Sequence, residues 1–528
     1  MLPKNAARAA TDNLQRTASD GRKDHDMPGL MLNEDDSHFY ACRPPEKINR
    51  DGVYELVDHY ISPPMKELIF NVNAMRANFP SRVWPRVWDG FDPGQGLDQP
   101  KLRAVPAEHR QRVWEMYRNL SSLDIPRCWI ERVRHHGRSA WLSVRMNDVH
   151  DVDNLDLPGH SPFWRDHPEY WRVPDPQRFT TWTDRAFDYG HQPVGEYFVS
   201  LIEEVFDRYD VDGLELDWMR FPLHFRPGFE DEGREILIDF HRRVRALADS
   251  HAGRRGHPIR IGVRVPSRPQ TAWAMGLDAV AWVKEKLVDL VVITPFWPTI
   301  EFDMPIELWR ELLAGSGATL AAGLEICVRP SPKVWPKHDD LVLNTAETAL
   351  GAAASLLDRG ADRIYLFNYM DSGTTVQDPD DYRSILNRAG DPSTIVDQPR
   401  RHVVTYSDTV APGEPEALAL PSLCRAGQPS RFRLHIGPKP ERGTARVFVG
   451  CGENGNQDTS PLEVHVNGTR CTPGEYPLPR PIHPVVRQVR GFAIPEGILH
   501  RGYNCVEVSS ASPDPHEVFW IEIRIEPA

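Results

Sequence analysis

The stretch YDVDGLELDWMRFP, residues 209–222, determines how the rest of the chain is interpreted. With the two-residue period of a β-strand, Leu214 and Leu216 point to one side, while Glu215 and Asp217 point to the other. A strand that is buried on both faces is apolar throughout, so two carboxylates on one face need a different setting. A closed barrel provides that setting, because the leucines can contact an outer helix while the acids face the central mouth.

The same strand pattern recurs along the chain, alternating with segments of helical periodicity. Eight strands are predicted, at 29–33, 66–73, 139–148, 209–217, 259–267, 288–297, 319–328 and 363–371. Helices are predicted at 51–61, 107–136, 193–208, 231–249, 276–287, 305–314 and 344–358. This alternation predicts a parallel (β/α)8 barrel over residues 28–392. A doubly wound open sheet is the competing architecture, but no glycine-rich phosphate loop follows any early strand.

The two ends of the chain differ from this central part. Residues 1–27 are polar and charged, which predicts a disordered leader and is not a signal peptide as it stands. The location is therefore cytoplasmic as the chain stands, or secreted or periplasmic if a signal has been removed. From 401 to 528, short runs such as LEVHVNG alternate with Gly, Pro and Asn turns, which predicts an all-β sandwich domain. We expect this domain to pack against the barrel or contribute to substrate contact.

Composition argues against several classes of partner. The 62 basic and 75 acidic side chains give a formal charge of −13, which disfavours nucleic acid or an anionic membrane. No apolar run approaches the ~18–20 residues that span a bilayer. The seven cysteines include no CxxC pair, so structural zinc is not expected. We expect no cofactor, and the oligomeric state stays open.

Polar side chains gather where the predicted strands end, the place where parallel barrels carry their chemistry. Unpaired buried charges cost several kcal/mol each, so such residues persist mainly where they meet one another, water or a ligand. We predict that they line a binding site, with three aromatic residues in position to stack on sugar rings. The predicted binding residues are Asn33, Asp36, Asn71, Asn73, Arg145, Asn147, Asp148, Trp218, Arg220, Arg264, Trp297 and Tyr369.

Two of the acids have the arrangement that glycosidic cleavage needs, one to protonate the leaving oxygen and one to act as nucleophile or base. We predict Asp217, on the fourth strand, as nucleophile or base, and Glu325, on the seventh, as general acid. Small residues precede Glu325, leaving room for a ligand and an apolar floor that would raise its pKa. Glu215 is predicted to support Asp217, with direct catalysis as the alternative. The competing interpretation is a buried ion network with Arg145 and Arg264.

The motif DGLELDWMR, preceded by RYDV, resembles the fourth-strand motif of the family 10-like bacterial glycoside hydrolases. The runs SVRMND (143–148) and GVRVPS (262–267) fit the same group, and the resemblance spans residues 29–390. It implies a (β/α)8 barrel with glycosidase activity. The motif is also similar to the DGxDxDxE strand of family 18 chitinases and to the nucleophile strand of α-amylase-type barrels. Met219 stands where chitinases have their catalytic Glu, so the acid must come from another strand.

Substrate class and two other functions stay open. Arg145, Arg220 and Arg264 suggest an anionic sugar, uronic or sulfated, unless they only neutralise the local acids. Met219 motivates the alternative of a carbohydrate-binding barrel without catalysis. The loop at 147–151, NDVHD, motivates a metal-dependent hydrolase or deacetylase, although hydrogen bonding is the simpler interpretation of that loop.

Overall fold

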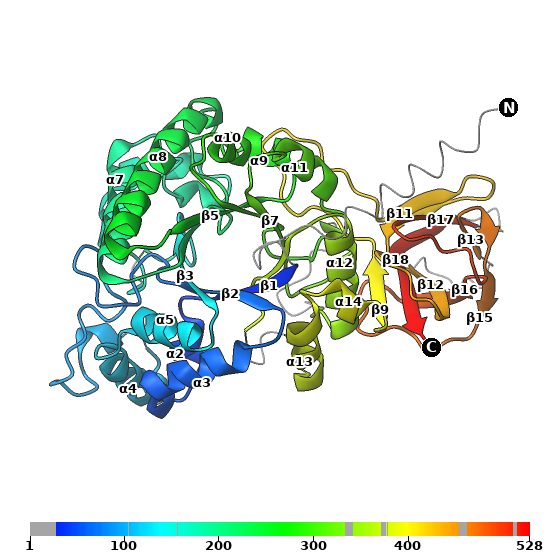
Figure 1. Ribbon diagram of the computed structural model, residues 1–528. Helices are drawn as coiled ribbons and strands as arrows, with labels where there is room; N and C mark the ends of the chain where they lie inside the picture. Colours follow the sequence, from blue (N-terminus) through cyan, green and yellow to red (C-terminus); the bar gives the residue numbers. More distant parts are fainter. Residues whose placement is uncertain are drawn as a thin grey trace.

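The computed structural model describes residues 28–528 except 104, 156, 333–341, 371–375, 377, 453–461 and 511–514. The predicted leader, residues 1–27, lies outside the described residues. The chain forms a barrel followed by two antiparallel sheets, seen at the two sides of Figure 1.

Eight parallel strands close into a barrel in chain order, so the prediction of a (β/α)8 barrel is confirmed. The closing pair is β1 with β8, where Leu30 lies opposite Ile364. The strands are β1 (Gly29–Glu34), β2 (Met65–Asn71), β3 (Ser139–Arg145), β4 (Gly213–Asp217), β5 (Arg260–Pro266), β6 (Leu290–Thr294), β7 (Thr319–Leu324) and β8 (Arg363–Leu366).

Helices surround the barrel, and several of them, such as α5 and α12, bury apolar side chains against it. The predicted helix at 107–136 divides in two, because Asp124 caps the second half and Pro126 suits only a first turn. No helix in the described part of the chain combines the length and apolarity that crossing a membrane requires. The helices are α2 (His38–Cys42), α3 (Arg50–Tyr60), α4 (Arg110–Leu120), α5 (Ile125–His135), α6 (Pro162–Asp166), α7 (Gln192–Arg208), α8 (Glu230–Arg255), α9 (Pro269–Ala274), α10 (Ala279–Lys284), α11 (Ile306–Leu312), α12 (Ala346–Asp358), α13 (Pro379–Arg388) and α14 (Pro392–Ile395).

The lower interior of the barrel is closed by Trp141. Its indole lies against Gly213 of β4, where an added Cβ would be 2.3 Å from a ring atom. Glycine at this position therefore makes room for the ring. The β3–β4 register places Ser143 beside Glu215 and Arg145 beside Asp217, in successive layers above the tryptophan. The apolar floor thus lies below a polar mouth at the carboxyl ends of the strands.

Two antiparallel sheets with an apolar core between them form the C-terminal part. One contains β9 (Arg400–Val403), β10 (Ser422–Cys424), β12 (Gly443–Cys451), β15 (Thr472–Gly474), β16 (Gln488–Ala493) and β18 (His516–Pro527). The other contains β11 (Ser430–His435), β13 (Leu462–Val466), β14 (Thr469–Arg470) and β17 (Tyr503–Ser510). The prediction of a barrel followed by an all-β domain is confirmed.

The two parts pack closely through α12 and β9, which lie side by side in Figure 1. A Cβ added to Gly351 of α12 would lie 2.1 Å from the carbonyl oxygen of Arg401 in β9. Arg401 in turn forms a fully buried ion pair with Glu522 of β18, at 2.7 Å. The all-β domain is therefore docked through backbone contact as well as through side chains.

Candidate active site

Glu215 lies inside the barrel, one layer below the mouth, and is fully buried. Its Oε1 accepts hydrogen bonds from Asn33 Nδ2 (3.0 Å), Ser143 Oγ (2.8 Å) and the Tyr365 hydroxyl (2.9 Å). Its Oε2 has no hydrogen-bond partner among the described residues. Burial, followed by the neighbouring charge of Asp217, raises the pKa of Glu215 to about 7. These bonds fix Glu215 beneath the mouth and suit a supporting residue.

Asp217, the last residue of β4, has both carboxyl oxygens engaged and is fully buried. Oδ1 accepts from the backbone N–H groups of Met219 (3.0 Å) and Arg220 (3.1 Å). Oδ2 accepts from Arg264 Nη1 at 2.7 Å. Three N–H donors, one of them cationic, hold the carboxylate in a fixed orientation. Met219, which stands where chitinases have their catalytic Glu, thus contributes its backbone N–H to Asp217.

Arg264 projects from β5 to the centre of the mouth and is fully buried. Its guanidinium lies 3.6 Å from the centre of the Phe367 ring, a cation–π contact. Beyond its bond to Asp217, its Nε and Nη2 have no partner within the described part of the chain. The ion pair that we weighed as an alternative interpretation is therefore present between Asp217 and Arg264.

Glu325 follows β7 directly and is also fully buried. Oε2 accepts from Asn368 Nδ2 at 3.1 Å, and Oε1 has no partner among the described residues. Burial raises the pKa of Glu325 well above its usual range, although Arg264 and Arg220 oppose the rise. The Tyr369 hydroxyl donates to the Glu325 carbonyl oxygen at 3.1 Å and holds the backbone. Glu325 thus has a raised pKa and one oxygen without a hydrogen-bond partner among the described residues.

The two predicted catalytic acids meet around one guanidinium. Arg264 binds Asp217 directly, and its charge also acts on Glu325. The environments of the two acids differ, because Asp217 accepts three N–H groups whereas the Glu325 side chain accepts one. Two carboxyl groups held in such different environments can divide the roles of nucleophile and acid.

Arg145, at the end of β3, belongs to a separate acidic cluster. It pairs with Asp35, with Asp36 at 3.3 Å and with Asp148 at 3.2 Å, and only 3% of its side chain is exposed. Burial, together with the charge of Asp35, raises the pKa of Asp36. Burial acts to raise the pKa of Asp35, but the charge of Arg145 and the hydrogen bonds from Asp36 and the Ser37 N–H together outweigh burial and hold that pKa well below its usual range. Arg145 is therefore bound by three acids and does not pair with Asp217 or Glu325.

Arg220 connects this cluster with the catalytic pair. It is partly buried, and its Nη2 lies 3.0 Å from His150 Nε2, whose ring in turn bonds Asp148 at 2.9 Å. Its guanidinium lies 5.8 Å from the centre of the Phe367 ring, and its charge acts on Glu325. Of the groups named so far at the mouth, Arg220 and His150 are among the more exposed.

Two of the predicted stacking residues offer no face to a ligand. Trp218 is fully buried, with its Nε1 at 3.3 Å from His241 of α8 and its ring 4.9 Å from that of His224. The alternation that turns Asp217 inward turns Trp218 outward, so the expectation of a sugar-stacking role for it is corrected. Tyr369 is also fully buried, and its hydroxyl is used on Glu325.

Three predicted binding asparagines brace loops. Asn73 donates to the Arg145 carbonyl and accepts from the Arg145 N–H, both at 3.1 Å. Asn147 makes the same pair of bonds to the backbone of Phe187, both at 3.1 Å. Asn71 accepts from the Asn73 N–H at 3.2 Å. These side-chain atoms serve the framework of the mouth.

Trp297 lies half-buried at the rim, after β6, and its backbone N–H donates to Asp408 at 2.9 Å. Asp408 is a residue that sequence reasoning missed, because it comes from a segment beyond the barrel. Tyr365 was also missed, although its two-residue spacing from Phe367 would have placed it inside the barrel. Asn368, with a φ of 62°, gave no sequence signal for its bond to Glu325.

In the described part of the chain, no group of three or more His, Cys, Asp or Glu is arranged to hold a metal ion. In the 147–151 loop, Asp148 is bonded to His150 and Arg145, and Asp151 is exposed. This loop therefore follows the hydrogen-bonding interpretation.

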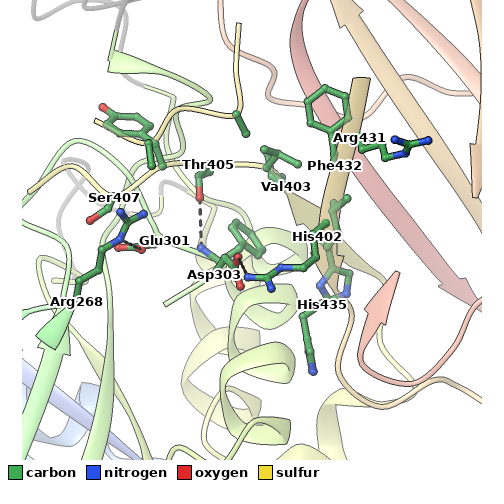
Figure 2. A pocket seen from close by; sticks show the side chains of 17 residues that line it. Arg268, Glu301, Asp303, His402, Val403, Thr405, Ser407, Arg431, Phe432 and His435 are labelled. Atoms are coloured by element: carbon green, nitrogen blue, oxygen red, sulfur yellow. Dashed lines mark hydrogen bonds and ion pairs between the residues drawn. The ribbon is translucent and has the colours of Figure 1, made fainter. Parts of the chain in front are cut away.

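A separate pocket of about 180 Å³ lies between the barrel and the all-β domain (Figure 2). Glu301 lines it, 2% exposed, and accepts from Ser267 Oγ at 2.6 Å. Burial raises the pKa of Glu301 to about 7. Thr405 and Phe432 close the pocket from the C-terminal side. Glu301 and Glu215 therefore both have a pKa of about 7, but Glu301 lies outside the mouth.

No protein-family model matches the chain, and no curated protein matches it. Among solved structures, it is similar to a cell-surface chitinase from Paenibacillus (8% identity, 94% of this chain and 54% of that one, TM-score 0.39). It is also similar to a family 36 α-galactosidase from Geobacillus stearothermophilus (12% identity, 92% of this chain and 56% of that one, TM-score 0.32). A chitinase from Bacillus thuringiensis is similar as well (8% identity, 94% of this chain and 100% of that one, TM-score 0.37). The chain thus spans little more than half the length of the first two, and these similarities assign no family.

Proposed function

We propose that this protein is a glycoside hydrolase that cleaves a poly- or oligosaccharide at the carboxyl ends of the barrel strands. Asp217 acts as nucleophile or base, and Glu325 acts as general acid. The observation that carries the proposal is that the two buried carboxyl groups differ in environment. Asp217 is ion-paired with Arg264, whereas burial raises the pKa of Glu325. The resemblance of the β4 motif to the family 10-like glycoside hydrolases supports it.

The chemistry follows from the atoms that remain available. Glu325 gives its proton to the glycosidic oxygen as the bond to the anomeric carbon breaks. Asp217 Oδ2 accepts one hydrogen bond, so a lone pair is left to attack that carbon or to take a proton from water. Glu215 stays below the pair, held by three hydrogen bonds, and keeps Asp217 in place.

We propose a neutral glycan as the first substrate class to test. Arg145 is already surrounded by three acids, and Arg264 is bound to Asp217, so neither presents an uncompensated charge. Uronic and sulfated glycans form the second arm of the test. At the rim, Arg220 and Trp297 are the side chains proposed to contact the sugar.

The test is turnover on a panel of neutral and anionic glycans, with Asp217→Asn and Glu325→Gln as variants. Each is expected to lower kcat about 10²–10⁴-fold, the range over which a positioned acid or base contributes. Glu301→Gln is the matched control, because Glu301 is a buried carboxyl of raised pKa outside the mouth. Equal losses in all three variants would refute the assignment.

A carbohydrate-binding barrel without catalysis is the second candidate function. It is favoured by the complete burial of Asp217 and Glu325 and by the engagement of both Asp217 oxygens. This candidate predicts binding of an oligosaccharide by wild type, no turnover on any glycan, and unchanged affinity in Asp217→Asn. Titration calorimetry beside the turnover assay separates the two functions.

A further inference from the structure

A segment of the C-terminal part returns to the barrel mouth. We call residues 404–416 the strap. It leaves β9, which is paired with β18 in the all-β domain, and contacts the segments that follow β5 and β6. Thr405 Oγ1 accepts from the Phe302 N–H at 3.3 Å, the dashed line in Figure 2. Ser407 Oγ lies 3.4 Å from Ser267 Oγ, directly after β5.

Asp408 is the strap residue that holds the mouth most directly. Its two oxygens accept from consecutive backbone N–H groups, Phe296 at 2.7 Å and Trp297 at 2.9 Å. These residues follow β6 after a single proline, so the carboxylate fixes the chain where it leaves the barrel. Thr409 Oγ1 donates a further bond to Asp408 at 3.0 Å. A bidentate clamp of this kind fixes the backbone from which the Trp297 side chain projects.

Asp408 also lies within electrostatic reach of Glu325. Four groups from different elements act on that acid: Arg264 on β5, Arg220 after β4, Asn368 after β8, and Asp408 on the strap. The first three lower the pKa of Glu325, whereas the charge of Asp408 raises it. Burial raises the pKa of Asp408 itself to about 6, so it is mostly charged at neutral pH.

We propose that Asp408 is a positioning residue of the active site, so that the C-terminal domain completes the mouth by fixing the Trp297 loop. This inference rests on the proposed function. The bonds of Asp408 to the backbone after β6 carry the proposal, and the effect of its charge on Glu325 gives a second measurable consequence.

The variant is Asp408→Asn in the full chain, which keeps the shape but loses the charge and one acceptor. Losing one of the two backbone bonds is expected to raise KM about fivefold. Without the carboxylate, the pKa of Glu325 falls, so the basic limb of the kcat–pH profile moves to lower pH. Glu414→Gln is the control, because Glu414 binds Thr271 at 2.8 Å and the strap itself but neither Trp297 nor Phe296.

A raised KM with a displaced basic limb in Asp408→Asn, and neither in Glu414→Gln, supports the proposal. Wild-type values in Asp408→Asn, or equal effects in both variants, overturn it. If Asp408→Asn does not fold, Asp408→Glu replaces it. A raised KM with an unmoved basic limb is then expected because the charge is kept, and an unchanged KM overturns the proposal.

If wild type turns over no glycan, the proposed function fails. The clamp is then measured by oligosaccharide affinity, which should be weakened in Asp408→Asn and unchanged in Glu414→Gln.

Discussion

Replacing Glu215 by glutamine tests whether the carboxyl group inside the barrel is protonated by its surroundings. In the Glu215→Gln variant, the carbonyl oxygen can accept the three bonds that Oε1 now accepts from Asn33, Ser143 and Tyr365. The new amide nitrogen takes the place of Oε2, which has no partner among the described residues. The glutamine side chain therefore mimics the protonated acid in shape and hydrogen bonding.

The expected magnitude follows from the pKa of about 7 in the fold against 4.5 for an ordinary glutamate. A raised carboxyl pKa stabilises the folded state below pH 4.5, and that stability is lost as the pH rises through 7. For Glu215 the loss is about 3 kcal/mol between pH 4 and pH 8, since each pH unit between the two pKa values costs about 1.4 kcal/mol. The glutamine of the variant has no proton to lose.

The assay is urea unfolding of wild type and Glu215→Gln at pH 4.5, 6, 7 and 8.5. The difference in unfolding free energy between them should grow by about 3 kcal/mol in favour of the variant, because the titrations of groups that Glu215 does not influence cancel. The variant should also keep measurable turnover if Glu215 only supports Asp217. Unfolding free energies that stay parallel across this range would refute the reasoning, since Glu215 would then titrate alike in the folded and unfolded chain.

Other predictions concern packing and charge pairs. Gly351→Ala should destabilise the protein by about 1–3 kcal/mol, because the added Cβ meets the β9 backbone. Gly253→Ala in α8, with open space around it, should stabilise the protein slightly, and thermal unfolding compares the two variants. Glu522→Ala should cost about 3–5 kcal/mol by leaving Arg401 buried and unpaired, measured by urea unfolding. Arg264→Met should cost a similar amount, and a stability equal to wild type would mean that Asp217 does not need its cation.

Much of the barrel could be predicted from the sequence, because strand alternation and helical spacing are local properties of the chain. The β4 motif placed Glu215 and Asp217 inward, and the same alternation placed Arg264 and Glu325 at one mouth. Trp218 was predicted to contact a sugar because it lies at the end of a strand. Alternation from Asp217 would have placed it on the outer face, where it is buried. Residue pattern decides which face a side chain occupies, and the structure follows it.

Pairing between elements could not be predicted in the same way. Arg145 pairs with Asp35 and Asp148, which reach it only through the loops after β1 and β3. Asp408 reaches the mouth only because β9 is held by the all-β domain. Such contacts depend on how distant segments dock, and no local period in the sequence encodes them.

The pairing of β9 with β18 has a consequence for the order in which the protein is made. Residues 400–403 lie opposite 522–525, so β9 cannot complete this edge until the last strand has left the ribosome. Domains fold as units, N-terminal ones first during synthesis, which lets the barrel close before the strap is anchored. A nascent chain halted ahead of residue 522 would therefore hold a closed barrel whose mouth still lacks a tethered Asp408.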